Sequence, residues 1–498
     1  MKASQQPNLI QWPSSPLAAK SLIAGEWVTG DGAAREILSP YNGAVLGTLY
    51  PVVAAQVSSC VSAAKKASEN WSLTPIKERS ASLLRFRELL LRDIESLSQS
   101  AARESGKLVS EGRAEILKGI EVLEFAASLQ NSDIGGSLEV SRGVTCEYRR
   151  EPLGVTAGIT PFNFPAMVPM WMIPISLALG NAFILKPSDK VPFTPCLLGE
   201  LLLEAGFPKG IFSILQGGKE VVEALVAHPA VQAVGFVGSS PVARAVYTGA
   251  TATGKRALCL GGAKNPLLVV PDADPAVTVD GVVASFTGCA GQRCMAASVL
   301  LAVGDVDDLI EKIVSAAREC RLGRDMGALI DAGAHSRLTN AIERAVQDGA
   351  ALKLDGRVRT APEGYENGFW LGPTILDNVR PSAESACVEL FGPVLSIVRV
   401  ANVDEAMQFE QASSFGNALS IFTTNGAVAR AVAQRASAGM IGVNIGVPVP
   451  REPFSFGGTK QSKFGTGDIT GAGGVEFWSN RKKITTKWAL QSDKNWMS

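Results

Sequence analysis

The sequence predicts an α/β protein whose sheets are mostly parallel. Two blocks of the chain, residues 155–275 and about 276–458, alternate short apolar runs with helical patterns, and glycines mark the turns between them. Strands that alternate with helices are typical of parallel sheets joined by right-handed crossovers. Hydrophobic residues make up 46% of the 498 residues and charged residues only 19%, which suits sheets buried on both faces or an oligomer. A chain of this length is expected to form about two to four domains.

Helices are expected first, over residues 57–131, where apolar positions recur three and four residues apart. Residues 136–154 alternate and are rich in charge, which predicts strands that leave the main body. Residues 165–185 are uncharged, but their prolines argue against a membrane-spanning helix and favour a buried element that runs into a strand. The C-terminal "VEFWSNRKKITTKWAL" alternates again, and it could pair with residues 136–154 or make subunit contacts.

Charge and composition exclude several classes of function. The 47 basic and 47 acidic side chains cancel and no dense Lys/Arg run occurs, so no nucleic-acid partner is expected. The N-terminus lacks the apolar core of a signal peptide, and the eight scattered cysteines form no C-x-x-C pair, which favours a soluble cytoplasmic protein. With two histidines and no H-E-x-x-H motif, no metal site is expected.

Two strand ends carry candidate groups for binding a dinucleotide. In "AVGFVGSSPVARAVY", residues 233–247, an apolar strand, a Gly-Ser turn and a helix with Pro241 in its first turn follow one another. The free N–H groups of such a helix start attract an anion, here a pyrophosphate, although G-x-G-x-x-G is absent and a plain βα turn stays an alternative. Lys186 and Asp189 in "ILKPSDK" could hold ribose hydroxyls or form an exposed charged loop.

A candidate nucleophile lies in "FTGCAGQRCMAAS", residues 286–298. Arg293 brings a positive charge beside Cys294, which opens an Ala/Met run that is expected to be helical. A thiolate is favoured near a fixed cation and a helix start, so Cys294 is the predicted nucleophile and Cys289 a packed residue. Asn163 in "TPFNFP" could donate its amide to a developing oxyanion, or could simply form a turn.

These motifs together resemble one enzyme family. "TPFNFP", "KPSD", "FVGSS", "GQRC" and "ELFGPV" occur in the order and spacing of the NAD(P)-dependent aldehyde dehydrogenases, and the resemblance covers essentially the whole chain. "FNFPAMVPMWMIP", "GGAKNPLLVVPDAD", "GCAGQRCMA" and "GVNIGVPVP" are similar to one branch, the CoA-acylating methylmalonate-semialdehyde and malonate-semialdehyde dehydrogenases.

The resemblance implies the aldehyde dehydrogenase fold, in which a Rossmann-like NAD-binding domain joins an α/β catalytic domain and a small β bridging element. It implies a homodimer or homotetramer built through the bridging element. The implied ranges are 1–131 and 152–262 for the NAD-binding domain, 263–458 for the catalytic domain, 459–477 for a returning segment, and 132–151 with 478–498 for the bridging element.

The resemblance also implies residue roles. Cys294 would attack the aldehyde, and Asn163 with the backbone N–H of Cys294 would hold the oxyanion. The family usually has glutamate where this chain has Asp189; the carboxylate is retained one methylene further back, so NAD is expected as cofactor with NADP less favoured. Ala243 stands where glycine is common, a mild departure that the dinucleotide fingerprint tolerates. The residues implied to bind the cofactor are Phe162, Lys186, Asp189, Gly238, Ser239, Glu389 and Phe391.

One expected group is missing. Most hydrolytic members carry a glutamate in "ELGGK" that activates the deacylating water. In "CLGGAKNP" neither Cys259 nor Leu260 supplies a carboxylate. A thiol is partly ionised near neutrality and needs less help from a base, so coenzyme A is the expected acceptor of the acyl group.

A β-carboxylated aldehyde fits this chemistry, because the acyl thioester could lose CO₂ and leave an enolate that the oxyanion donors stabilise. Methylmalonate semialdehyde would yield propionyl-CoA, and malonate semialdehyde acetyl-CoA. Arg293 is the first candidate to bind the substrate carboxylate. Lys118 stands where the branch has a second arginine. Lysine keeps the positive charge but cannot form the paired, bidentate hydrogen bonds that arginine makes with a carboxylate.

Two alternatives stay open. A CoA-independent, hydrolytic dehydrogenase of a small acidic or other aldehyde would need a substitute base, and Glu389 is the carboxylate that the motifs place near the cofactor. A non-catalytic relative would not require Cys294, Asn163 and Glu389 together.

Overall fold

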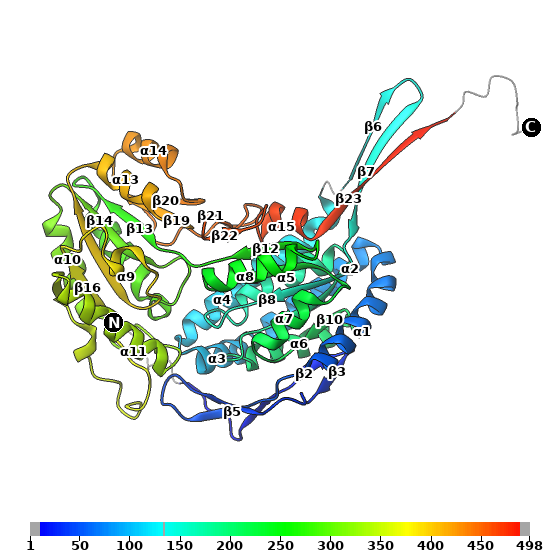
Figure 1. Ribbon diagram of the computed structural model, residues 1–498, viewed down its shortest axis with the longest axis horizontal. Coiled ribbons are helices and arrows are strands. Elements are labelled where there is room, and N and C mark those ends of the chain that lie inside the picture. Colours follow the sequence, from blue (N-terminus) through cyan, green and yellow to red (C-terminus); the bar gives the residue numbers. More distant parts are fainter. Residues whose placement is uncertain (1–9, 133–134, 489–498) are drawn as a thin grey trace, which may run out of the picture.

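The computed structural model describes residues 10–132 and 135–488, and it contains the two large sheets that the alternating blocks predict. Figure 1 shows the first sheet with its helices in the centre of the molecule, the second at the left, and a narrow arm of strands that leaves the body at the upper right.

Four helices lie where the spacing of apolar residues predicts them. Their bounds are α1 (Ala54–Leu73), α2 (Ile76–Arg92), α3 (Ile94–Ser105) and α4 (Val109–Ser128). Pro75 precedes α2, and Gly106 ends α3 with φ of 82°, a left-handed conformation that glycine adopts without strain. Helix α4 carries several residues of the site described below.

The first sheet has eight strands. They are β2 (Ser21–Ile23), β3 (Glu26–Val28), β8 (Val155–Ile159), β9 (Ala182–Lys186), β10 (Phe212–Ile214), β11 (Val231–Val237), β12 (Arg256–Leu260) and β22 (Lys463–Phe464). Their order is β22-β12-β11-β8-β9-β10-β2-β3. The five central strands are parallel, whereas β2, β3 and β22 are antiparallel edge strands that the alternating pattern did not predict.

The order of the parallel strands locates a ligand site. From β8 the chain proceeds through β9 to β10 on one side, and later through β11 to β12 on the other. The order therefore reverses between β8 and β11, and open α/β sheets bind ligands outside the carboxyl ends of the strands at this switch point.

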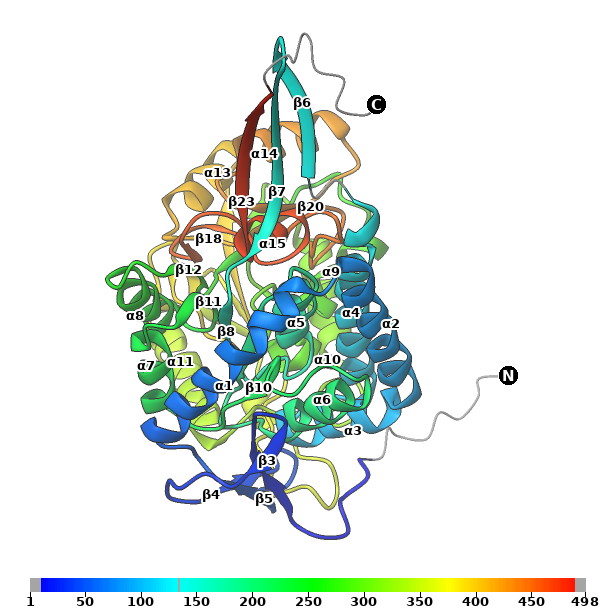
Figure 2. The same cartoon turned by 90° about the vertical axis from the view of Figure 1, so that its right-hand side faces the viewer.

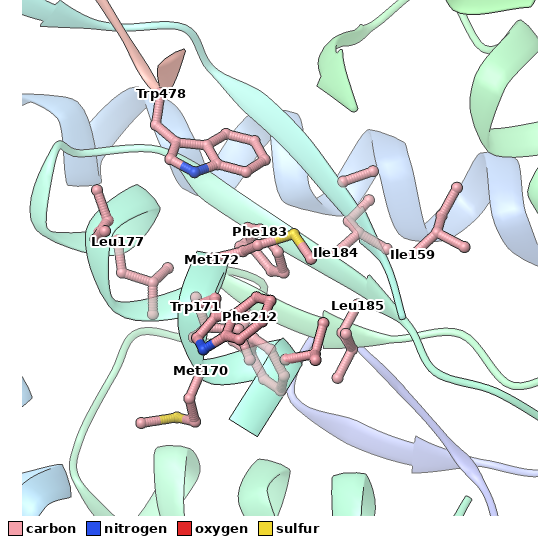
Figure 3. Close-up of a cluster of buried hydrophobic side chains, with 14 of the residues drawn as sticks. Ile159, Met170, Trp171, Met172, Leu177, Phe183, Ile184, Leu185, Phe212 and Trp478 are labelled. Carbon is pink, nitrogen blue, oxygen red and sulfur yellow. The ribbon is translucent and has the colours of Figure 1, made fainter. Parts of the chain in front are cut away.

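Helix α5 (Met167–Ala178) packs on this sheet and accounts for most of the uncharged stretch 165–185. All 12 residues of α5 are buried, and Figure 3 shows its Met170, Trp171 and Met172 in one cluster with Phe183 and Leu185 of β9. The sheet is also covered by α6 (Phe193–Glu204), α7 (Lys219–Ala227) and α8 (Ser240–Thr251). Within residues 10–132 and 135–488, no helix is long and apolar enough to cross a membrane.

The second sheet has seven strands. They are β13 (Asn265–Val269), β14 (Ala297–Val303), β15 (Ala351–Leu354), β16 (Thr374–Asp377), β17 (Val394–Val400), β19 (Ala418–Phe422) and β20 (Met440–Val443). Their order is β15-β16-β17-β14-β13-β19-β20, and only β15 is antiparallel to its neighbour. Its helices are α9 (Pro275–Thr287), α10 (Asp307–Arg318), α11 (Ala332–Gln347), α12 (Glu384–Cys387), α13 (Val403–Ala412) and α14 (Gly426–Arg435).

The arm consists of β6 (Gly135–Ser141), β7 (Val144–Pro152) and β23 (Ser479–Lys487), and both views show it projecting from the body (Figures 1 and 2). Strand β23 pairs antiparallel with β7 from Ser479↔Pro152 to Lys487↔Val144, so the C-terminal piece does pair with residues 136–154. Residues 133–134 and 489–498 of the predicted bridging element lie outside the described residues. The domain limits drawn from the resemblance stay a prediction.

Smaller elements complete the fold. They are β1 (Leu17–Ala19), β4 (Arg35–Leu38) and β5 (Val45–Leu49) in one sheet, β18 (Phe415–Gly416) with β21 (Thr459–Lys460), and α15 (Gly471–Phe477) before the arm.

Candidate active site

A buried hydroxyl without a partner and a buried ammonium lie at the carboxyl edge of the first sheet at its switch point. Lys186 ends β9 beside the end of β8, and its carbonyl accepts the Thr160 N–H at 3.1 Å. The Thr160 hydroxyl is buried and has no hydrogen-bond partner within the described chain. Lys186 is 6% exposed, and burial lowers the pKa of its ammonium to about 8. Unpaired buried polar groups are costly, so their presence here indicates a place for a polar ligand.

The helix start after β11 adds free donors to the same edge. Gly238 and Ser239 form the turn between β11 and α8, Ser239 has extended backbone angles, and its side chain caps no backbone N–H. A helix start of this kind binds phosphate through its open N–H groups and its dipole. The residues present therefore fit a dinucleotide at this edge.

Phe162 and Phe391 lie together, as expected for residues that share one ligand. Their ring centroids are 5.8 Å apart with an interplanar angle of 80°, although the two residues are far apart in sequence. Glu389 Oε1 accepts a hydrogen bond from the Ala263 N–H at 3.0 Å. Burial raises the pKa of the Glu389 carboxyl to about 7. The adjacent Arg337 of α11, which the sequence did not single out, donates to the Leu390 carbonyl.

The loop that carries the nucleophile is not the start of a helix. A short 3-10 turn, Gly288–Gly291, contains Cys289, Ala290 and Gly291 with φ of 50°, 52° and 70°. Cys294 follows in a turn that leads directly into β14, so the expectation of a helical Ala/Met run is wrong. The apolar residues that follow complete a parallel strand of the second sheet, and tertiary pairing overrides local helix propensity.

Gly291 fixes the path of this loop. A Cβ there would lie 2.2 Å from the backbone carbon of Gly392, and φ is positive. The loop can therefore touch the segment that carries Glu389 and Phe391 only with glycine at position 291.

Two amide side chains hold the backbone at Cys294. Its carbonyl accepts hydrogen bonds from Asn265 Nδ2 and Asn417 Nδ2, both at 2.9 Å. Burial, and next the charge of Glu389, raise the pKa of the Cys294 thiol to about 12, while the charge of Arg293 acts in the opposite direction. The sequence prediction of a favoured thiolate is therefore wrong for the free protein, because burial outweighs the cation.

Asn163 is anchored through its backbone, which leaves its side chain at the nucleophile loop. Its carbonyl accepts the Lys107 ammonium at 2.7 Å, and Lys107 pairs with Glu115 in a contact that is almost fully buried. Its Nδ2 donates to the Gln292 carbonyl at 2.9 Å. The amide is thus fixed before any substrate binds, as an oxyanion donor must be.

Cys294, Arg293 and Lys118 open into one cavity of about 410 Å³. Its walls are mostly apolar, which suits a small substrate. The lining residues that carry the argument are Glu111, Glu115, Lys118, Cys289, Arg293 and Cys294. The structure thus brings the predicted nucleophile and both predicted carboxylate-binding residues to one place.

A cavity-lining cysteine, a fixed amide donor and a sheet edge that fits a dinucleotide are together typical of one enzyme family. The family model for aldehyde dehydrogenases matches residues 27–484. The chain belongs to the aldehyde dehydrogenase family. The fold predicted from the resemblance is confirmed.

Relatives with known names share this fold and much of the sequence. Malonate-semialdehyde dehydrogenase 1 of Bacillus licheniformis is 41% identical over 475 residues, covering 94% of this chain and 97% of the relative. A candidate methylmalonate-semialdehyde dehydrogenase of Sinorhizobium meliloti, solved in complex with NAD, has a TM-score of 0.94 at 39% identity, covering 96% and 99%. The methylmalonate-semialdehyde dehydrogenase of Oceanimonas doudoroffii has a TM-score of 0.93 at 38% identity, covering 95% and 98%.

The two cations in the cavity of this aldehyde dehydrogenase differ in how far they are neutralised. Arg293 Nη2 lies 3.3 Å from Glu111 Oε1. Lys118 Nζ lies 2.9 Å from a Glu121 oxygen and 3.0 Å from a Glu452 oxygen. Arg293 therefore faces one carboxylate and Lys118 two, so Arg293 is the better placed to bind an anionic substrate.

Among the described residues that line the cavity, no carboxylate is free to act as a base. Cys259 and Leu260 are buried in β12, and the two glutamates that line the cavity are engaged. Glu111 accepts the Cys289 N–H at 2.6 Å and the Leu108 N–H at 2.9 Å besides its contact with Arg293. Glu115 accepts the Ala166 N–H at 2.9 Å and pairs with Lys107.

Several residues of this aldehyde dehydrogenase site could not be recognised from the sequence alone. Each acts through a partner distant in the chain, and only the fold brings the two together. The residues are Lys107, Glu111, Glu115, Asn265, Arg337 and Asn417. Within the described ranges there is no cluster of three or more His, Cys, Asp or Glu side chains that could hold a metal ion.

Proposed function

We propose that this aldehyde dehydrogenase oxidises malonate semialdehyde or methylmalonate semialdehyde with NAD and coenzyme A, releasing CO₂ and forming acetyl-CoA or propionyl-CoA. One observation carries the proposal: the cavity presents Cys294 and a cation, Arg293, while its own carboxylates are engaged. The names of the relatives from Bacillus licheniformis and Oceanimonas doudoroffii support the substrate class.

Cys294 begins the reaction by attacking the aldehyde carbon: the C–S bond forms as the C=O π bond breaks, and the thiol proton passes to solvent. The oxygen of the thiohemiacetal is held by Asn163 Nδ2 and by the backbone N–H of Cys294. Asn265 and Asn417 keep that backbone in place through its carbonyl. Arg293 binds the carboxylate at the other end of the substrate and so orients the aldehyde toward the sulfur.

Bound NAD would supply the hydride acceptor, and loss of a hydride from the thiohemiacetal carbon would leave a thioester on Cys294. The residues that would hold it are Phe162, Lys186, Asp189, Gly238, Ser239, Glu389 and Phe391. Loss of CO₂ from the β-carboxylate then gives an enolate whose oxygen takes the place of the oxyanion at Asn163. The enolate carbon takes up a proton from solvent, which gives the acetyl or propionyl thioester. The CoA thiol then attacks the acyl carbon, and Cys294 leaves as a thiolate that takes up the proton released by CoA.

Identification of the products tests the proposal. With malonate semialdehyde labelled at the carboxylate carbon, the expected products are acetyl-CoA without label and labelled CO₂. Methylmalonate semialdehyde should likewise yield propionyl-CoA. Malonyl-CoA or free malonate as the main product would contradict the proposal. Mass spectrometry distinguishes these two from acetyl-CoA and propionyl-CoA.

Replacing Arg293 with alanine is expected to raise KM for the acidic semialdehyde by about 10–100-fold, since a hydrogen bond to a charged group contributes about 1.5–3 kcal/mol. KM for propanal, a neutral aldehyde of similar size, should change by less than about threefold because propanal lacks the carboxylate. Steady-state rates with both aldehydes provide the measurement. Arg293→Lys keeps the charge and should restore part of the loss, whereas equal losses for both aldehydes would exclude carboxylate binding.

Binding of NAD is expected to weaken below neutral pH. The Glu389 pKa is raised to about 7 by burial, so the carboxyl is protonated below that pH and loses acceptor strength toward ribose hydroxyls. KM for NAD should therefore rise as the pH falls through 7, by up to about tenfold per pH unit. Glu389→Gln should remove this dependence. A wild-type KM that does not change with pH, or an unchanged slope in the variant, would contradict the role of Glu389.

A hydrolytic dehydrogenase is the second candidate function, and Glu389 is the observation that favours it. A buried carboxyl with a pKa of about 7 has the proton affinity of a general base at neutral pH. Its charge also acts on the Cys294 thiol. Dependence of turnover on CoA, described at the end of the Discussion, separates the two functions. A cytoplasmic location and a homodimer or homotetramer stay predictions.

A further inference from the structure

An ion pair occupies the ribose end of the proposed cofactor site. Arg35 Nη1 of β4 lies 3.3 Å from Asp189 Oδ2 in the loop after β9, and both side chains are partly exposed. The two residues are 154 positions apart, so no local sequence pattern connects them. Lys186, the other residue implied to bind the ribose, is near enough for the charges of both to affect its pKa.

Gly218, which lies next to this ion pair, puts no side chain beside it. A Cβ at Gly218, which precedes α7, would lie 3.4 Å from Arg35 Nη1 and 3.8 Å from Asp189 Oδ2. The same point is 3.3 Å from Glu220 Oε2. A groove lined by Arg35, Asp189 and Lys190 continues from there, and Lys190 is paired with Asp331. Arg35 therefore presents its guanidinium to an open region at the carboxyl end of β9.

A carboxylate at this point of a dinucleotide site accepts the ribose hydroxyls of NAD and repels the 2′-phosphate of NADP, whereas a nearby arginine accommodates that phosphate. Here the carboxylate belongs to an aspartate, and its charge is offset by Arg35. A guanidinium has five N–H donors, and one contact with Asp189 leaves others for a phosphate.

We propose that Arg35 is a cofactor-specificity residue that lets this enzyme accept NADP as well as NAD, by binding the 2′-phosphate beside Asp189. The inference rests on the proposed function, because it takes the edge at Lys186 as the ribose site. The hydride transfer itself is the same with either cofactor.

Binding to the free protein tests the proposal without any turnover. Isothermal titration calorimetry would compare NADP with NAD, and adenosine 2′,5′-bisphosphate with adenosine 5′-monophosphate, on wild type and Arg35→Gln. The wild-type protein should bind NADP. Arg35→Gln should lower the affinity for NADP and for the bisphosphate by about 10–100-fold, because it removes a hydrogen bond to a charged group. The affinities for NAD and for the monophosphate should change by less than about threefold.

Two further variants sharpen the result. Arg92→Gln is the matched control, because Arg92 is as exposed as Arg35 and also pairs with carboxylates, Asp93 and Glu204, on another face. It should leave both cofactors unaffected. Asp189→Asn should weaken the binding of NAD and leave the binding of NADP unchanged or tighter, since the 2′-phosphate no longer faces a carboxylate.

Absence of NADP binding by the wild type, or equal weakening of both cofactors by Arg35→Gln, would overturn the proposal. Failure of the proposed function would look different. In that case calorimetry would still show that Arg35→Gln weakens NADP binding more than NAD binding, but the enzyme would form no acyl-CoA from either semialdehyde.

Discussion

Cys294→Ala should abolish turnover and also the first equivalent of NADH, lowering kcat by on the order of 10⁴-fold or more. Without the sulfur no thiohemiacetal forms, and no thioester can follow. The backbone should stay in place because Asn265 and Asn417 bind the carbonyl of residue 294 and not its side chain. Stopped-flow absorbance of NADH measures both the burst and the steady state.

Cys289→Ala is the matched control for this substitution. Cys289 lines the same cavity and is buried, whereas Cys294 is partly exposed. Cys289 is held in the left-handed turn, and alanine already occupies such a conformation at position 290. Its loss should change kcat by less than about threefold. A variant at position 289 that is as inactive as the one at 294 would contradict the assignment of the nucleophile, as would labelling of Cys289 by iodoacetamide in preference to Cys294.

Asn163→Ala should lower kcat by about 10²–10³-fold, the usual effect of removing one oxyanion donor, with a smaller change in KM. The amide contributes only as negative charge develops on the substrate oxygen, so its loss raises the barrier more than it weakens binding. Lys107 binds the backbone carbonyl of residue 163, and that anchor survives the substitution. Steady-state kinetics and thermal unfolding of the variant would be compared with wild type. A fall in Tm without a loss of kcat would assign Asn163 a purely structural role.

The sequence was informative where local patterns determine the structure. Apolar runs such as "ASVLLAV" and "ALSIFTTN" coincide with β14 and β19, because a parallel strand buried on both faces needs continuous apolar residues. Pairing of the C-terminal piece with residues 136–154 is confirmed by the register of β23 and β7. The edge strands β3 and β22 are three and two residues long and carry too little pattern to be recognised.

The environment of the nucleophile could not be predicted in the same way. Arg293 next to Cys294 suggested a lowered pKa, but the degree of burial that raises it depends on the whole fold. The Lys107–Glu115 pair and the Arg35–Asp189 pair each join residues from different elements, so no spacing in the sequence predicts them. The residue roles taken from the resemblance stay predictions that the variants above would test.

The dependence of NADH formation on coenzyme A tests the central claim most directly. With NAD and malonate semialdehyde in excess, the enzyme should release about one equivalent of NADH per active site and then stop, because a thioester on Cys294 without a placed base hydrolyses slowly. Addition of CoA should convert this burst into sustained turnover with formation of acetyl-CoA. Sustained turnover without CoA, with a free acid as product, would contradict the acylating mechanism and establish the hydrolytic one.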